Sequence, residues 1–211
     1  MPPESIGHHF ALTLRAGADL RLRLLESGME NLLRATEAVS SSLRRGGKLL
    51  LFGNGGSAAD AQHIATEFVC RFKHSRKPLA ALSLVTDTSA LTAIGNDYGF
   101  EQIFARQVLA LGAPDDIVIA ISTSGASPNV LAGIRAASSI GIRSIGFSGG
   151  DGGRLARLVE IPVVVPSNDT ALVQECHITL GHLLCGAVEL LLKSAKSSKL
   201  PRKQHKTGNA R

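Results

Sequence analysis

Two ionisable residues, His63 and Glu67, stand four positions apart just after a glycine-rich segment. At about 100° per residue of an α-helix, side chains four positions apart lie on one face. An imidazole and a carboxylate placed together can move protons or bind a metal ion. The spacing lacks the second histidine of the H-E-x-x-H zinc-protease motif, and taken alone such a pair is typical of a solvated helix surface. Other parts of the chain must decide between these interpretations.

The preceding segment is Gly53-Asn54-Gly55-Gly56-Ser57, which follows an apolar run over 49–52. Three glycines let the backbone turn sharply and approach a ligand closely. Free N–H groups at the start of the following helix favour an anion. The spacing is not that of a nucleotide P-loop, and it is not G-x-G-x-x-G, so dinucleotide binding is weakly supported. We predict a strand, an anion-binding turn and a helix.

A second candidate segment, 122–127, carries four hydroxyl groups and a glycine between an apolar run and Pro128. Proline is common at the first position of a helix. Hydroxyls together with free helix N–H groups suit a phosphate that is held without Lys or Arg. Helix capping would account for one or two of these hydroxyls but hardly for four. We predict a phosphate site here.

The elements that must position these residues follow an alternating pattern. Short apolar runs predict strands over 49–52, 79–85, 117–121, 143–147 and 161–165. Helices are expected over 10–45, from 58 through 67, and over 86–94, 100–111, 130–139 and 170–192. Alternation of this kind predicts an α/β fold with a mainly parallel sheet covered on both faces. Ligands of such sheets gather at the carboxyl ends of the strands, where both candidate segments fall.

The N-terminal segment has the period of an amphipathic helix that Gly46-Gly47 ends. Its predicted apolar stripe consists of Leu25, Met29, Leu32, Leu33, Thr36, Val39 and Leu43. A helix of this kind before the first strand must cover the sheet or pair with another subunit.

Composition limits the classes of protein to consider. A chain of 211 residues with 44% hydrophobic content suits one compact domain with a sizeable core. The formal net charge is +6, but residues 193–211 hold seven Lys and Arg and no acidic residue, so residues 1–192 carry −1. We therefore expect a basic, disordered tail over 193–211 and no specific nucleic-acid partner.

Other features point to a cytoplasmic protein without a membrane span. The three cysteines are widely spaced and form no C-x-x-C motif, which is typical of reduced thiols. The N-terminus lacks a basic and then apolar signal pattern. The longest apolar run, 178–192, is too short to span a bilayer and contains His182 and Glu189.

Several motifs, taken in order, resemble the phosphoheptose isomerases of the sugar-isomerase (SIS) domain superfamily. They are GNGGSAADAQH-x-A-x-E (53–67), AIGNDYGF (93–100), AISTSGASPNV (120–130), GFSGGDGG (146–153) and QECHITLGH (174–182). The resemblance reaches from the N-terminal helix to about Leu192. It implies a SIS domain over 47–192 after an N-terminal helical segment over 1–46. The implied fold is a flavodoxin-like, five-stranded parallel sheet with helices on both faces.

The resemblance also implies an activity and an assembly. These enzymes interconvert sedoheptulose 7-phosphate and D-glycero-D-manno-heptose 7-phosphate, the first step toward the nucleotide-activated heptose of bacterial surface polysaccharides such as lipopolysaccharide. They are homotetramers with active sites between subunits, and many bind zinc. The implied zinc ligands are His63, Glu67, Gln174 and His182. The implied substrate-binding residues are Asn54, Gly55, Gly56, Ser57, Glu67, Asn96, Asp97, Ser122, Thr123, Ser124, Ser127 and Gln174.

The chemistry of the reaction fits these residue types. Aldose–ketose isomerisation through an enediol needs a base near one carbon and an acid near the oxygens. We assign Glu67 as the base and His182 as its acid–base partner. A zinc ion on two His, a Glu and a Gln carbonyl would polarise the substrate carbonyl. Because one carboxylate cannot be a tight metal ligand and a free base at once, one of these roles of Glu67 is transient.

Two positions depart from the family pattern. Leu172 stands where many members have a basic residue, and Ala171 stands near the place of an acidic residue in some members. Asp169 is close but out of register. These departures concern helper residues and rate, and they leave the reaction class unchanged.

Three alternatives share the fold. A non-catalytic SIS protein that binds a partner such as the bacterial replication initiator would keep the glycine turn but lose the acid–base pair. A sugar-phosphate-sensing transcription factor needs a DNA-binding module, for which the first 45 residues are too short. An isomerase acting on a phosphorylated pentose or hexose would differ in pocket size, which the sequence does not show.

Overall fold

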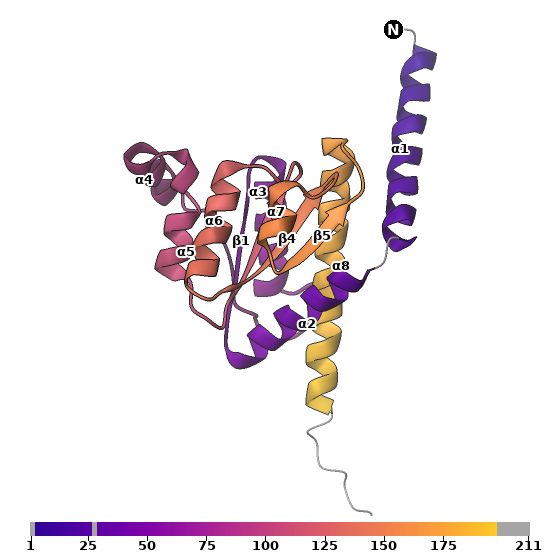
Figure 1. The fold of residues 1–211 in the computed structure, drawn as a ribbon. Coiled ribbons are helices and arrows are strands. Elements are labelled where there is room, and N and C mark those ends of the chain that lie inside the picture. Colours follow the sequence, from indigo (N-terminus) through magenta and orange to yellow (C-terminus); the bar gives the residue numbers. More distant parts are fainter. Residues whose placement is uncertain (1–2, 27–28, 198–211) are drawn as a thin grey trace, which may run out of the picture.

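The computed structural model describes residues 3–26 and 29–197, which form a three-layered α/β fold (Figure 1). Five parallel strands make one sheet in the order β2-β1-β3-β4-β5. The strands are β1 (Leu49–Gly53), β2 (Ala81–Ser83), β3 (Ile117–Ser122), β4 (Arg143–Gly149) and β5 (Ile161–Val165). This order is that of flavodoxin-like sheets, and it confirms the predicted fold class.

Helices cover both faces of the sheet. They are α1 (Pro3–Glu26), α2 (Glu30–Arg45), α3 (Gly56–Val69), α4 (Thr88–Tyr98), α5 (Ala105–Leu111), α6 (Pro128–Ser139), α7 (Gly153–Leu158) and α8 (Thr170–Ser197), with a short 3₁₀ helix at Phe100–Gln102. Helices α2, α3 and α8 pack on one face, with α1 outside α8, and α5, α6 and α7 pack on the other. Helix α4 projects from one side of the body (Figure 1).

The core consists of two apolar layers, one on each face of the sheet. Successive side chains of a strand point to opposite faces, so Leu49 and Leu51 join the layer under α2, α3 and α8. Leu50 and Phe52 join the layer under α5 and α6. Every residue of β1 and β3 is buried, as expected for the central strands of a parallel sheet.

The N-terminal helix predicted over 10–45 is two helices, α1 and α2, with residues 27–28 outside the described part. The predicted stripe is correspondingly wrong in two places. Leu25 belongs to α1 and is exposed, and Leu33 is exposed because it lies 100° from the buried side of α2. The predicted end is confirmed: Gly46 takes the left-handed conformation, with φ 91°, after the last turn of α2.

Three further helices differ from the prediction. Helix α4 extends to Tyr98, so Asn96 and Asp97 lie in its last turn rather than in a loop. Helix α7 was not predicted. Helix α8 continues through Ser197, five residues into the segment expected to be a disordered tail, and residues 198–211 lie outside the described part.

By length and composition alone, α8 is apolar enough over Thr170–Ser194 to cross a membrane. Within the protein, 44% of its most apolar window is buried. It also carries His177, His182 and Glu189, which contact other parts of the chain. We therefore interpret α8 as a core helix.

Candidate active site

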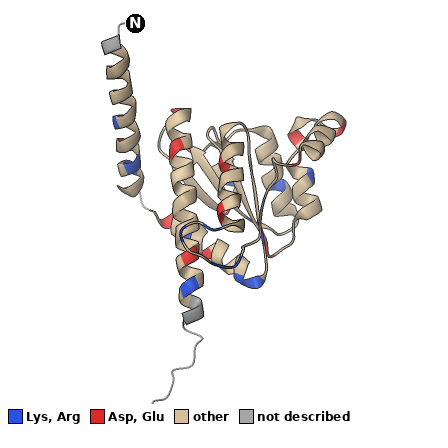
Figure 2. Cartoon of the chain, turned by 180° about the vertical axis from the view of Figure 1, so that it is seen from behind, with Lys and Arg blue, Asp and Glu red and all other residues tan. Residues whose placement is uncertain are grey.

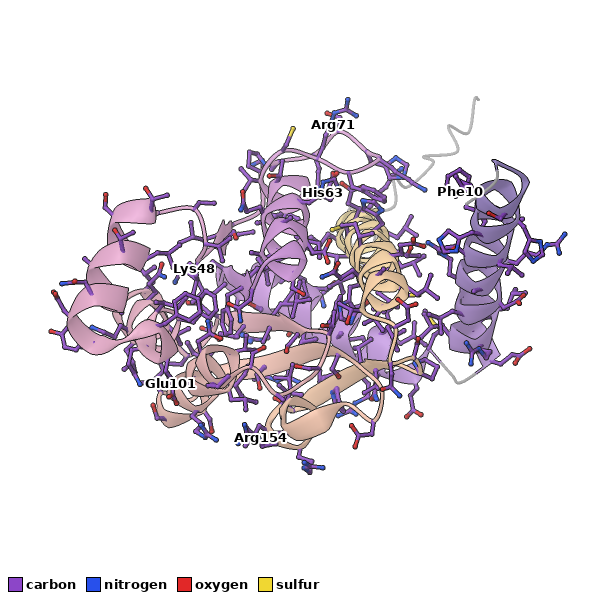
Figure 3. All side chains as sticks on the ribbon, turned by 90° about the horizontal axis from the view of Figure 1, so that it is seen from above. Phe10, Lys48, His63, Arg71, Glu101 and Arg154 are labelled. Carbon is purple, nitrogen blue, oxygen red and sulfur yellow. The ribbon has the colours of Figure 1, made fainter. Side chains whose placement is uncertain are left out.

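Three ionisable side chains meet between α3 and α8, the two helices that pack with α2 on one face of the sheet. His63 and Glu67 lie one turn apart on α3, with His63 Nε2 3.4 Å from Glu67 Oε1. His182 of α8 faces them, and its Nε2 lies 2.9 Å from His63 Nε2. Figure 3 shows His63 where α3 faces α8, and Figure 2 shows acidic residues on both helices. The structure thus brings the predicted base and its partner together.

Close packing of the two helices makes this convergence possible. Gly181 directly precedes His182 and lies against Ile64, the neighbour of His63. A Cβ atom on Gly181 would come within 2.5 Å of Ile64 Cδ1. The glycine therefore lets α8 approach α3 closely enough for side chains on both helices to meet.

Asp60 is a further ionisable residue of this region that the sequence analysis did not select. It precedes His63 by three positions on α3, and its Oδ2 is buried without a hydrogen-bond partner among the described residues. Burial raises the pKa of Asp60 to about 6, and the charge of His63 opposes this shift. The spacing of three from His63 was the available signal, since such residues share a helix face.

The glycine turn forms the predicted start of α3. Gly55 has φ 55°, a conformation that favours glycine, and no side chain caps the helix. The N–H groups of Ala58 and Ala59 donate to the carbonyl groups of Asn54 and Gly55, so those of Gly56 and Ser57 are the ones open to an anion. Asn54 exchanges two side-chain hydrogen bonds of 2.8 and 2.9 Å with Asn129, which joins this turn to α6, and Ser57 is buried.

The hydroxyl-rich segment lies at the carboxyl end of β3, beside the glycine turn. Ser127 precedes α6 but does not cap it with its side chain; instead its Oγ lies 3.1 Å from Ser122 Oγ. Thr123 and Ser124 line a cavity of about 250 Å³ together with residues that follow β4 and β5. Capping therefore does not account for these hydroxyls, and the segment keeps the features of a phosphate site.

Gln174, Asn96 and Asp97 lie apart from the His–Glu–His cluster, as does the glycine turn, which precedes His63 by about two turns of α3. Gln174 packs against the backbone of Gly56, where a Cβ atom would be 2.6 Å from its Nε2. Eight residues of α8, a rise of about 12 Å, separate it from His182. Asn96 and Asp97 are exposed on α4 and hydrogen-bond to each other at 2.8 Å. Within one chain, the structure does not bring these three residues to the cluster.

A larger cavity, of about 750 Å³, lies beside the loop that follows α3. It is lined by the end of α2, residues 74–79 and the end of α8. The cluster and both loops of the candidate site lie outside it. The ionisable groups His63, Glu67 and His182 meet at the cluster, which is therefore the candidate site.

The cluster fits a metal ion by the chemistry of its donor atoms. One ligand atom from each of His63, Glu67 and His182 lies within 4.8 Å of the other two. Two imidazole nitrogens and a carboxylate oxygen form a set that zinc accepts in catalytic sites, where three protein ligands leave one position open. Gln174, the fourth predicted ligand, is not part of this set.

Comparison with known proteins identifies the family to which this chain belongs. Residues 14–149 match the SIS domain family, so the chain is a SIS domain protein. The phosphoheptose isomerase of Roseiflexus sp. (strain RS-1) is 51% identical over 191 residues, 90% of this chain and 97% of that protein. That of Paramagnetospirillum magneticum is 52% identical over 192 residues, with 91% and 96% covered. The chain belongs to the phosphoheptose isomerase family.

Solved structures agree with this assignment. The phosphoheptose isomerase from Neisseria gonorrhoeae has a TM-score of 0.80 and 40% identity, over 90% of this chain and 100% of that one. The enzyme from Francisella tularensis has a TM-score of 0.83 and 35% identity, over 90% and 99%. The predicted family is thereby confirmed.

Proposed function

We propose that the protein is an isomerase that converts sedoheptulose 7-phosphate to D-glycero-D-manno-heptose 7-phosphate. The observation that carries this proposal is the meeting of Glu67 and His182, from helices far apart in the sequence, in a member of the phosphoheptose isomerase family. A non-catalytic SIS protein would have no need of this pair, so that alternative is not favoured.

The reaction is a proton shift between two adjacent carbons. Glu67 takes a proton from C1 of the ketose, which gives an enediol, and a proton returned to C2 gives the aldose. His182 moves a proton between the two oxygens. The hydroxyls of Ser122, Thr123, Ser124 and Ser127, together with the free N–H groups of the glycine turn, hold the phosphate. All atoms balance, since the product is an isomer of the substrate.

A zinc ion is the cofactor that we propose. His63, Glu67 and His182 would hold it, and when bound it would polarise the sugar carbonyl. The geometry that supports this is the set of three donor atoms within 4.8 Å of one another. Because one carboxylate cannot be a tight metal ligand and a free base at once, one of these two roles of Glu67 would be transient.

We further propose a homotetramer whose active sites lie between subunits. Helix α4, which carries the predicted substrate ligands Asn96 and Asp97, has no buried residue in the single chain. Helix α1 exposes apolar side chains, among them Phe10 and Leu14. Both features suit contacts with further copies of the chain. A cytoplasmic location and a role in lipopolysaccharide synthesis complete the proposal.

The test is direct incubation of the pure protein with sedoheptulose 7-phosphate in deuterated water, followed by NMR. We expect an aldose product that carries deuterium at C2, because the enediol is reprotonated from an exchangeable site. Absence of any aldose from the folded, zinc-loaded protein would contradict the proposed function. Turnover of a phosphorylated pentose or hexose in its place would favour the other phosphosugar isomerases.

A further inference from the structure

Glu189 is a buried carboxylate that holds the loop after α3. Its side chain is only 2% exposed. It accepts hydrogen bonds from three successive backbone N–H groups, those of Phe72, Lys73 and His74, at 3.0 to 3.2 Å. A fourth comes from Arg76 Nε at 2.9 Å. A buried charge needs such partners, so Glu189 fixes the path of this loop against α8.

Arg76 connects Glu189 to the last turn of α3. Its guanidinium donates to the backbone oxygen of Glu67 at 2.6 Å and to that of Phe68 at 2.8 Å. The last carbonyl groups of a helix have no partners within it, and a cation there is favoured by the helix dipole. Arg76 therefore ties the turn that carries Glu67 to the Glu189 carboxylate.

Phe72 connects the same loop to His182. The two rings are stacked, with centroids 5.3 Å apart and planes 17° apart. His182, Gly186 and Glu189 lie on one side of α8, at spacings of four and three. Gly186 faces the Phe72 ring, where a Cβ atom would lie 3.4 Å from Cε1, an ordinary contact distance. The loop that is hydrogen-bonded to Glu189 therefore stacks the Phe72 ring on the imidazole of His182.

We propose that the buried Glu189–Arg76 pair positions both catalytic side chains, His182 through the stacked ring of Phe72 and Glu67 through its backbone carbonyl. Glu189, Arg76 and Phe72 are positioning residues. Phe72 contacts the ring of His182, Arg76 contacts the backbone of Glu67, and Glu189 contacts Arg76 and the backbone of the loop. The inference rests on the proposed function, which makes Glu67 and His182 the groups that act on the sugar. It adds to that function an ion pair, Arg76–Glu189, that orients the catalytic residues although its two members lie 113 positions apart in the sequence.

The test compares Glu189→Gln and Phe72→Leu with the wild type in the full-length, zinc-loaded protein. We expect kcat for sedoheptulose 7-phosphate to fall about 10- to 100-fold, as for other residues that orient catalytic ligands. KM should stay within about twofold, since the phosphate site is elsewhere. Phe72→Tyr keeps an aromatic ring and should restore kcat. In protein with labelled histidine, the His182 ring protons should shift in Phe72→Leu and Glu189→Gln but not in Phe72→Tyr.

Arg143→Gln is the matched control, because it breaks an exposed ion pair with Glu160 at the start of β4 and β5, and among the described residues neither is hydrogen-bonded or ion-paired to Glu189, Arg76 or Phe72. It should leave kcat and the His182 resonance unchanged. Wild-type kcat in folded Phe72→Leu, or an unmoved His182 resonance, would overturn the proposal, as would equal losses in Phe72→Leu and Phe72→Tyr. Phe72→Leu keeps the Glu189–Arg76 pair, so it tests the contact between Phe72 and His182 even if Glu189→Gln does not fold. Failure of the wild type to isomerise the sugar would reject the proposed function, whereas the NMR comparison would still test the positioning.

Discussion

His177 is expected to make the protein's stability depend on pH. Its side chain is fully buried on α8 beside the ring of Phe147. Burial lowers its pKa from 6.5 to about 4, and the backbone of Ser148 opposes this shift. Below pH 6.5 the unfolded chain therefore binds a proton that the folded protein does not, so stability is lost as the pH falls from 6.5 through 4. The shift corresponds to about 3 kcal/mol, of which about 2 kcal/mol is lost by pH 5.

The assay is denaturant unfolding of the wild type and of His177→Gln at pH 7.5 and pH 5.0. The variant cannot titrate at this position, and its lost packing is the same at both pH values. We expect the wild type to lose about 2 kcal/mol more than the variant, equivalent to about 4–8 °C in Tm. Asp60, whose raised pKa acts in the opposite direction, is present in both proteins and cancels. Equal losses in the two proteins would refute the reasoning.

Three further predictions concern the substrate, the metal and the assembly. Ser124→Ala should raise KM about 10- to 100-fold with little change in kcat, because it removes one hydrogen bond to a charged phosphate; steady-state kinetics showing a loss confined to kcat would argue against a phosphate contact. Chelation should lower activity and Tm, and added zinc should restore both, whereas unchanged values would indicate a metal-free site. Sedimentation should give a particle of four 22.1 kDa chains, and a monomer would contradict the tetramer.

The alternation of apolar runs and helices was enough to predict the sheet and the two loops at its carboxyl edge. β5 (Ile161–Val165) occupies the predicted range, and β1 and β3 differ from theirs by one residue at the end. Central strands of a parallel sheet are buried on both faces, so they appear in the sequence as continuous apolar runs. The division of the N-terminal segment into α1 and α2 was missed because the prediction followed the apolar period through Ser27-Gly28, a dipeptide that is typical of turns.

The site was predicted in part. The resemblance selected His182 rather than His177, and the structure shows why the two differ: five positions apart, they point about 140° apart around α8, His177 into the core and His182 toward His63. Glu189 and Arg76 could not be found in this way, because their contact depends on how a loop folds against a helix 113 positions away. Asn96 and Asp97 lie on a helix that has no buried residue in the single chain, so the role predicted for them would require the proposed assembly.

The most direct test of the mechanism is the turnover of Glu67→Gln followed by NMR. This variant keeps the shape of the side chain but removes the base, and sugar-phosphate binding should remain close to that of the wild type. We predict that aldose formation falls at least about 100-fold, as expected for loss of a general base. Aldose formation at the wild-type rate would contradict the assignment of Glu67 and with it the central role of the His63–Glu67–His182 cluster.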